Sequence, residues 1–126
     1  MIPRSLLWIT ALSCLAALGS CRYCSTSIEP AIEVQVRDVE SGLPAAERAT
    51  GYVQDGSYVD SLQTYGSNGQ GVPLSFRAAD ERPGIYTVVV IKEGYQTWKR
   101  EGVRVDRDEC HVQTRSLTAA LVPTTE

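Results

Sequence analysis

Residues 31–38, AIEVQVRD, carry the pattern that decides the fold. Three apolar residues alternate there with three polar ones: Ile32, Val34 and Val36 against Glu33, Gln35 and Arg37. Successive side chains of a β-strand point to opposite faces of the sheet, so this alternation predicts a strand with one buried and one solvated face. The three apolar residues are therefore candidates for a hydrophobic core.

The chain beyond this stretch also reads as short strands separated by turns. Strands are predicted at 48–55, 57–64, 72–80, 85–93, 95–106 and 111–122. Residues 85–93, IYTVVVIKE, are the most apolar of these and predict a central strand buried on much of both faces. No stretch combines a helical period with a cap. About seven strands of this length predict an all-β fold, a single antiparallel β-sandwich.

Several single residues refine this prediction. The core should include Tyr86, Val88, Val90 and Leu121 beside the three residues of the first strand. Asp55-Gly56 is a favoured hairpin turn, Pro73 fits best at an edge or a strand start, and Gly102 marks a bulge. Residues 65–71, YGSNGQG, are expected to form a loop, and Tyr65 in it is a candidate exposed binding contact.

The N-terminus has the three parts of a secretory signal. Arg4 is followed by the apolar run 6–18, LLWITALSCLAAL, and then by the small residues Gly19 and Ser20. A membrane-spanning helix needs about 20 apolar residues, and this run is shorter. We therefore expect residues 1–20 to be a signal peptide.

Leu18-Gly19-Ser20-Cys21 resembles the lipobox of bacterial lipoproteins. In that family signal peptidase II cuts before the cysteine, whose sulfur carries a diacylglycerol. The resemblance implies lipidation of Cys21 and a lipidated tether over residues 21–30; the alternative is a plain secretory cut. Cys14 is a weaker candidate because the bulky Leu12 lies two places before it. Arg22, rather than aspartate, follows Cys21, which implies the outer membrane if the host is Gram-negative.

Size and charge limit the partners. Cleavage before Cys21 leaves 106 residues, enough for one small domain. The net charge of −3 becomes −4, because Arg4 is the only charged side chain removed. The basic residues are scattered and form no stripe, so a nucleic acid is not an expected partner.

Two cysteines remain, Cys24 and Cys110, in an exported and oxidising compartment. An even pair of this kind suggests a disulfide, and the alternative is two reduced thiols. Lipid on Cys21 excludes a redox or zinc pair between Cys21 and Cys24. Cys110 and His111 are neighbours whose side chains diverge on a strand, so we expect no metal site and no cofactor.

Five segments occur in an order that resembles the carboxypeptidase regulatory-like, transthyretin-related β-sandwich domain. They are residues 36–38 (VRD), 41–44 (SGLP), 83–90 (PGIYTVVV), 94–95 (GY) and 103–105 (VRV). The resemblance covers residues 31–122 and implies a β-sandwich domain over 31–123. It also implies a non-catalytic module that stabilises or binds other proteins. The closing segment from Cys110 resembles the last strand of small lipoproteins with this domain, and their cysteine ahead of the first strand corresponds to Cys24.

No catalytic motif stands out in the sequence. His111 is the only histidine, and we interpret it as structural because a general base needs partnered geometry. Asp106, Asp108 and Glu109 lack a calcium-loop spacing. The prediction is therefore a non-enzymatic module, anchored in the bacterial cell envelope by lipid on Cys21, that binds or supports a protein or an envelope polymer. The alternative is a small envelope hydrolase or metal-dependent enzyme.

Overall fold

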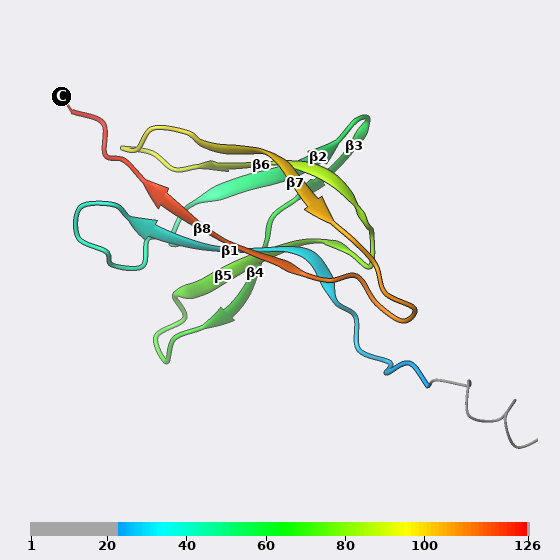
Figure 1. Cartoon of the computed structure of the whole chain (residues 1–126). Helices are drawn as coiled ribbons and strands as arrows, with labels where there is room; N and C mark the ends of the chain where they lie inside the picture. Colours follow the sequence, from blue (N-terminus) through cyan, green and yellow to red (C-terminus); the bar gives the residue numbers. More distant parts are fainter. Residues whose placement is uncertain (1–22, 126) are drawn as a thin grey trace, which may run out of the picture.

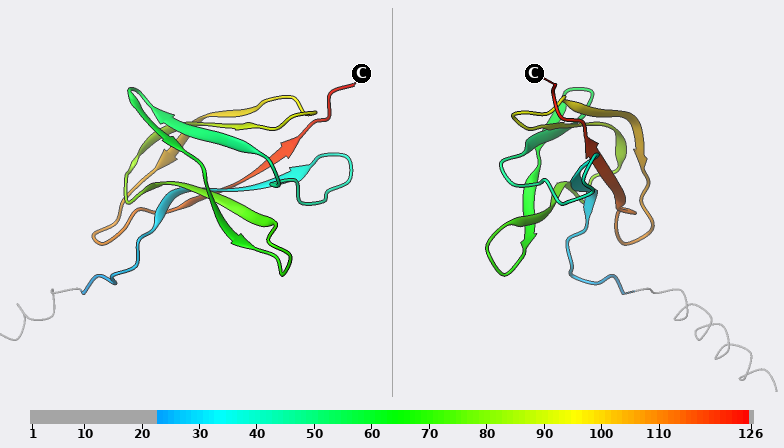
Figure 2. Two further views of the ribbon diagram at one scale, coloured as in Figure 1. Left: turned by 180° about the vertical axis from the view of Figure 1, so that it is seen from behind. Right: turned by 90° about the vertical axis from the view of Figure 1, so that its left-hand side faces the viewer.

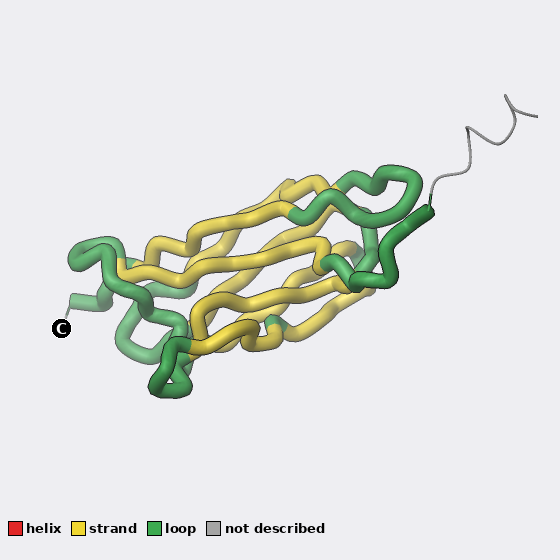
Figure 3. Tube along the Cα trace, turned by 90° about the horizontal axis from the view of Figure 1, so that it is seen from below, coloured by secondary structure: helices red, strands yellow, loops and turns green. Residues whose placement is uncertain are grey.

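Two four-stranded sheets pack face to face in the computed structural model, which describes residues 23–125 (Figure 1). The strands are β1 (Pro30–Asp38), β2 (Thr50–Asp55), β3 (Tyr58–Ser61), β4 (Gln63–Ser67), β5 (Pro73–Asp80), β6 (Gly84–Ile91), β7 (Trp98–Val105) and β8 (Arg115–Leu121). The first sheet has the order β4-β5-β1-β8 and the second β3-β2-β6-β7. Figure 3 shows strands and loops only in the described part, so the predicted all-β sandwich is confirmed there. The predicted signal peptide and Cys21 lie outside the described residues.

The core lies between the two sheets, on the faces that the alternation of apolar and polar residues predicted to be buried. The seven predicted core residues, Ile32, Val34, Val36, Tyr86, Val88, Val90 and Leu121, are each at most 2% exposed. β1 and β6 are inner strands of their sheets, which explains why they are the most regular apolar segments. Burying each such aliphatic side chain contributes about 1.5 to 3 kcal/mol, so both strands contribute substantially to the stability of the domain.

The strand count is eight because the predicted strand 57–64 is two strands. Leu62 lies between β3 and β4, is 8% exposed, and donates its N–H to the carbonyl of Gly51 at 3.0 Å. At this residue the chain leaves the second sheet and enters the first. β4 then extends as far as Ser67, into the segment that the sequence predicted to be a loop.

One strand pair departs from the antiparallel prediction. β1 and β8 are parallel, in a register that runs from Ile32 opposite Arg115 to Asp38 opposite Leu121. Parallel neighbours need a long crossover connection, and the rest of the domain supplies it here. The first sheet is therefore mixed, whereas the second is antiparallel throughout.

The special residues act largely as predicted. Pro73 begins β5, and the β6–β7 register shifts by one residue beside Gly102, whose φ of +68° suits a bulge. The β2–β3 turn pairs Asp55 with Tyr58, so the two-residue loop begins at Gly56, one place later than predicted. The bulge and the β2–β3 turn fix the register of the second sheet.

The two ends of the described chain leave the sandwich at opposite ends. The segment from Tyr23 runs away from the end that carries the β7–β8 loop, and the C-terminus lies at the far end (Figures 1 and 2). Within residues 23–125 there is no helix of the length and apolarity that crossing a membrane would require.

Candidate functional site

A disulfide joins Cys24 to Cys110, with Cα atoms 5.1 Å apart. It connects the segment ahead of β1 to the loop between β7 and β8, across a sequence separation of 86 residues. The pairing predicted for these two cysteines is confirmed. The segment that precedes the first strand is thereby attached to one end of the sandwich.

His111, next to the disulfide, bridges two segments through its two ring nitrogens. Its Nδ1 lies 2.6 Å from Oε1 of Glu81, and its Nε2 lies 3.0 Å from Oγ of Ser25. Glu81 follows β5 and has a φ of +52°, which a residue other than glycine rarely adopts. The histidine therefore connects the end of β5, the β7–β8 loop and the N-terminal segment.

Backbone groups complete this arrangement. The carboxylate of Glu81 accepts the N–H of Glu29 at 2.9 Å and that of Val112 at 3.3 Å. In return, the N–H of Glu81 donates to the carbonyl of Glu29 at 2.8 Å. We call Cys24, Ser25, Glu29, Glu81, Cys110 and His111 the N-terminal clamp. These residues hold the segment ahead of β1 by covalent, ionic and backbone contacts together.

The clamp shifts the pKa values of its ionisable groups. The Glu29 N–H and the His111 ring lower the pKa of Glu81 below its ordinary value. The hydrogen bond to Glu81 raises the pKa of His111. In the β7–β8 loop, the backbone N–H groups of His111 and Cys110 lower the pKa of Asp108. The pair of Glu81 and His111 is therefore favoured in its doubly charged state.

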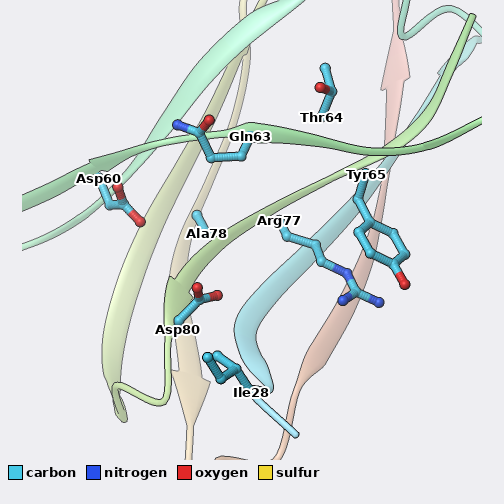
Figure 4. A pocket seen from close by; sticks show the side chains of 8 residues that line it. All are labelled: Ile28, Asp60, Gln63, Thr64, Tyr65, Arg77, Ala78 and Asp80. Carbon is cyan, nitrogen blue, oxygen red and sulfur yellow. The ribbon is translucent and has the colours of Figure 1, made fainter. Parts of the chain in front are cut away.

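A groove of about 270 Å³ lies beside β4, at the edge of the first sheet. We call it the β4 groove. Its lining residues come from the segment ahead of β1 and from β3, β4 and β5: Ile28, Asp60, Gln63, Thr64, Tyr65, Arg77, Ala78 and Asp80 (Figure 4). The groove is on the outside of the sandwich and combines apolar, aromatic and charged side chains.

Tyr65 and Arg77 form one wall of the β4 groove. The guanidinium carbon of Arg77 lies 3.2 Å from the centre of the Tyr65 ring, and Figure 4 shows the two side chains against each other. Arg77 is opposite Glu33 of the neighbouring strand β1, and Oε2 of Glu33 lies 3.4 Å from the arginine Nε. Tyr65 remains 50% exposed, so its ring presents a fixed aromatic face to solvent.

Two carboxylates form the opposite side of the groove. Oδ2 of Asp60 accepts the N–H of Ala79 at 2.8 Å and so joins β3 to β5 across the two sheets. This bond holds Ala79 at a φ of +59°. The side chain of Asp80 is exposed and makes no hydrogen bond or ion pair with another described residue. Ile28, 66% exposed, lies near it as an apolar contact.

The predicted site residues fall into different places. Tyr65 lies in β4 rather than in a loop, and Cys24 and Cys110 form part of the clamp. Asp60 and Glu81, which organise the groove and the clamp, had no distinguishing pattern in the sequence. Across residues 23–125, no group of three or more histidine, cysteine, aspartate or glutamate side chains is arranged to hold a metal ion.

Comparisons with protein-family models and with curated proteins found no match to this sequence.

Proposed function

We propose that this chain is a lipid-anchored, non-enzymatic module of the bacterial cell envelope that binds a partner protein at the β4 groove. The observation that carries the proposal is the position of the groove. It lies beside an edge strand whose five residues are all exposed, and the half-exposed ring of Tyr65 is fixed in it by Arg77. Protein-binding surfaces commonly use such pre-ordered aromatic side chains.

The anchoring part of the proposal rests on the sequence. The apolar run 6–18 and the quartet ending at Cys21 support export and lipidation. Lipid on Cys21 would be three residues from the disulfide at Cys24, so the clamp would hold the sandwich close to the bilayer. The ordered motifs from residue 36 to residue 105 support placing the domain with the carboxypeptidase regulatory-like sandwiches.

Site-specific photo-crosslinking in intact cells tests the binding surface. A photoreactive residue replaces Tyr65 in the full chain, and a matched variant carries it at Ile85 on β6, where the native side chain is 57% exposed. We expect a discrete adduct with an envelope protein from position 65 and none from position 85. Equal adducts from both positions, or none from position 65, would contradict the proposal.

One observation favours the alternative, a small hydrolase. Ser25, His111 and Glu81 are linked in the order of nucleophile, base and acid, at 3.0 Å and 2.6 Å. Two facts count against it: the Ser25 hydroxyl also contacts Ser27 at 2.7 Å, and the raised pKa of His111 favours an imidazolium, which cannot accept a proton.

A fluorophosphonate probe separates the two functions, because it labels an activated serine covalently. The binding module predicts no labelling of Ser25. A hydrolase predicts labelling that Ser25→Ala and His111→Gln abolish and that Ser27→Ala, the matched control, leaves intact.

A further inference from the structure

We propose that the β4 groove binds an extended peptide strand that pairs with the free edge of β4 and places a lysine or arginine side chain between Asp60 and Asp80. This inference rests on the proposed function, since it names the partner chemistry of the same surface. Four observations carry it: the state of the sheet edges, the composition of β4, the charge of the groove and the register of its residues.

The sandwich has four edge strands, and three of them carry features that hinder pairing with another chain. β3 has only four residues. β7 is rich in charged side chains and contains the bulge at Gly102. β8 is tied to β7, because Arg115 donates to the carbonyl of Arg104 at 3.1 Å.

β4 has none of these features. Its sequence, QTYGS, contains neither a charge nor a proline, and all five residues are exposed. Its register with β5 is regular, from Gln63 opposite Arg77 to Ser67 opposite Pro73. An edge strand directs alternate N–H and C=O groups away from its neighbour, so β4 offers a regular row of backbone donors and acceptors to an added strand.

The charge and the apolar surface of the groove favour one kind of side chain on the added strand. The charge of Arg77 is compensated by Glu33, whereas Asp60 and Asp80 have no cationic partner among the described residues. Ile28 and Tyr65 provide apolar surface beside them. A long basic side chain matches both features, because its aliphatic stem packs on apolar surface while its charged end reaches the carboxylates.

The register places this side chain along the added strand. Gln63 is opposite Arg77, and Asp80 lies three residues beyond Arg77 on β5. Asp60 precedes β4 by three residues, so both carboxylates lie at the Gln63 end of the strand. Because alternate residues of a strand point to opposite faces and both offsets are odd, the basic residue should pair with Gln63 or with its neighbour Thr64, which both line the groove.

Selection from a displayed library of random nonapeptides, with the full chain in detergent micelles as target, tests the inference. We expect enriched peptides to alternate β-branched and polar residues around a lysine or arginine. Asp80→Lys should weaken their binding by about tenfold or more, since it sets a like charge against the basic side chain. Glu101→Lys on β7 makes the same change in net charge and should alter affinity by less than about twofold, as rim charges far from the contact do.

Backbone methylation of a selected peptide tests the pairing itself. Only alternate N–H groups of an added strand face β4. Methylation of the odd-numbered amides and methylation of the even-numbered amides should therefore differ: one set abolishes binding and the other is tolerated. The inference is overturned by selection of no peptide or of peptides without a basic residue. Equal effects of Asp80→Lys and Glu101→Lys, or indifference to methylation, also overturn it.

A second copy of this chain is the competing occupant of β4. Sedimentation of the full chain then shows concentration-dependent dimers that Tyr65→Lys disperses, and this result also overturns the inference. Crosslinking from position 65 in cells together with methylation-insensitive peptides would retain the proposed binding surface and reject strand addition alone. If position 65 gives no crosslink in cells but peptides still bind as strands, strand addition would be retained and the proposed binding of an envelope protein would be rejected.

Discussion

Nδ1 of His111 lies 2.6 Å from Oε1 of Glu81, and this contact joins the β7–β8 loop to the end of β5 at a carboxylate that also accepts the N–H of Glu29, ahead of β1. The two groups stabilise the fold over different ranges of pH. The contribution of His111, whose pKa is raised, is complete below 6.5 and is lost as pH rises through the raised pKa. That of Glu81, whose pKa is lowered, is complete above 4.5 and is lost as pH falls through the lowered pKa.

His111→Gln should therefore destabilise the domain most between about pH 4.5 and 6.5, and less at higher and lower pH. Urea unfolding of both proteins over a pH series measures the difference in free energy of unfolding. Lys99→Gln is the control, because it removes a salt bridge to Glu101 at an exposed site on β7 that involves no histidine. A His111→Gln difference that is flat from pH 4 to pH 9 would contradict the prediction.

Removing the disulfide should lower the free energy of unfolding. The double variant Cys24→Ala, Cys110→Ala loses a cross-link over 86 residues, for which loop entropy gives about 4 to 5 kcal/mol as an upper bound. We expect a loss of about 2 to 5 kcal/mol in urea unfolding, and wild-type protein under reducing conditions should match the variant. An unchanged unfolding midpoint would show that the clamp holds without its covalent part.

Gly51→Ala should destabilise the domain, because β2 has no room for a methyl group at this position. An added Cβ would overlap the carbonyl oxygen of Val89 and lie 2.7 Å from Cδ1 of Leu62. We expect a loss of about 1 to 3 kcal/mol or more, measured by thermal unfolding. Gly69→Ala is the matched control, since no atom lies within 4 Å of its added Cβ. Similar losses in both variants would refute the steric explanation.

Cys21→Ala tests the lipid anchor, which lies outside the described residues. In a bacterial host the variant should move from the membrane fraction to the soluble envelope fraction, because its acyl chains supply the membrane affinity. Mass spectrometry of the wild-type protein should show a diacylglyceryl cysteine at its mature N-terminus. Cys14→Ala should remain in the membrane. A soluble wild-type protein with an unmodified N-terminus would reject the anchor.

The elements that the sequence predicted well are those whose side chains face the core. The alternation of β1 and the apolar run of β6 reflect burial directly, so the strands and their buried residues follow from the pattern. The Cys24–Cys110 pairing followed from the small number of cysteines that remain if residues 1–20 are a signal peptide and Cys21 carries lipid. The strands depend on a pattern within a single stretch of sequence, and the disulfide depends on a count of cysteines.

The elements that the sequence did not reveal depend on distant partners. β4 is held by backbone pairing to β5 and buries none of its own residues, so YGSNGQG looked like a loop. The parallel pairing of β1 and β8 joins opposite ends of the chain and has no local signature. Glu81 and His111 are 30 residues apart, and no local pattern connects them. Tyr65 was recognised as exposed, but its fixed position requires Arg77 from the next strand.

The parallel pairing of β1 with β8 also governs the order in which the domain can be assembled. Among the described strands β1 is synthesised first, and β8, its neighbour in the sheet, is synthesised last. Contacts of such long sequence separation form late and slowly. A chain that ends before Cys110 would leave β1 unpaired on one side and would lack the disulfide, so it should be cleaved by proteases more readily than the full chain. The complete first sheet therefore forms only once β8 is available to pair with β1.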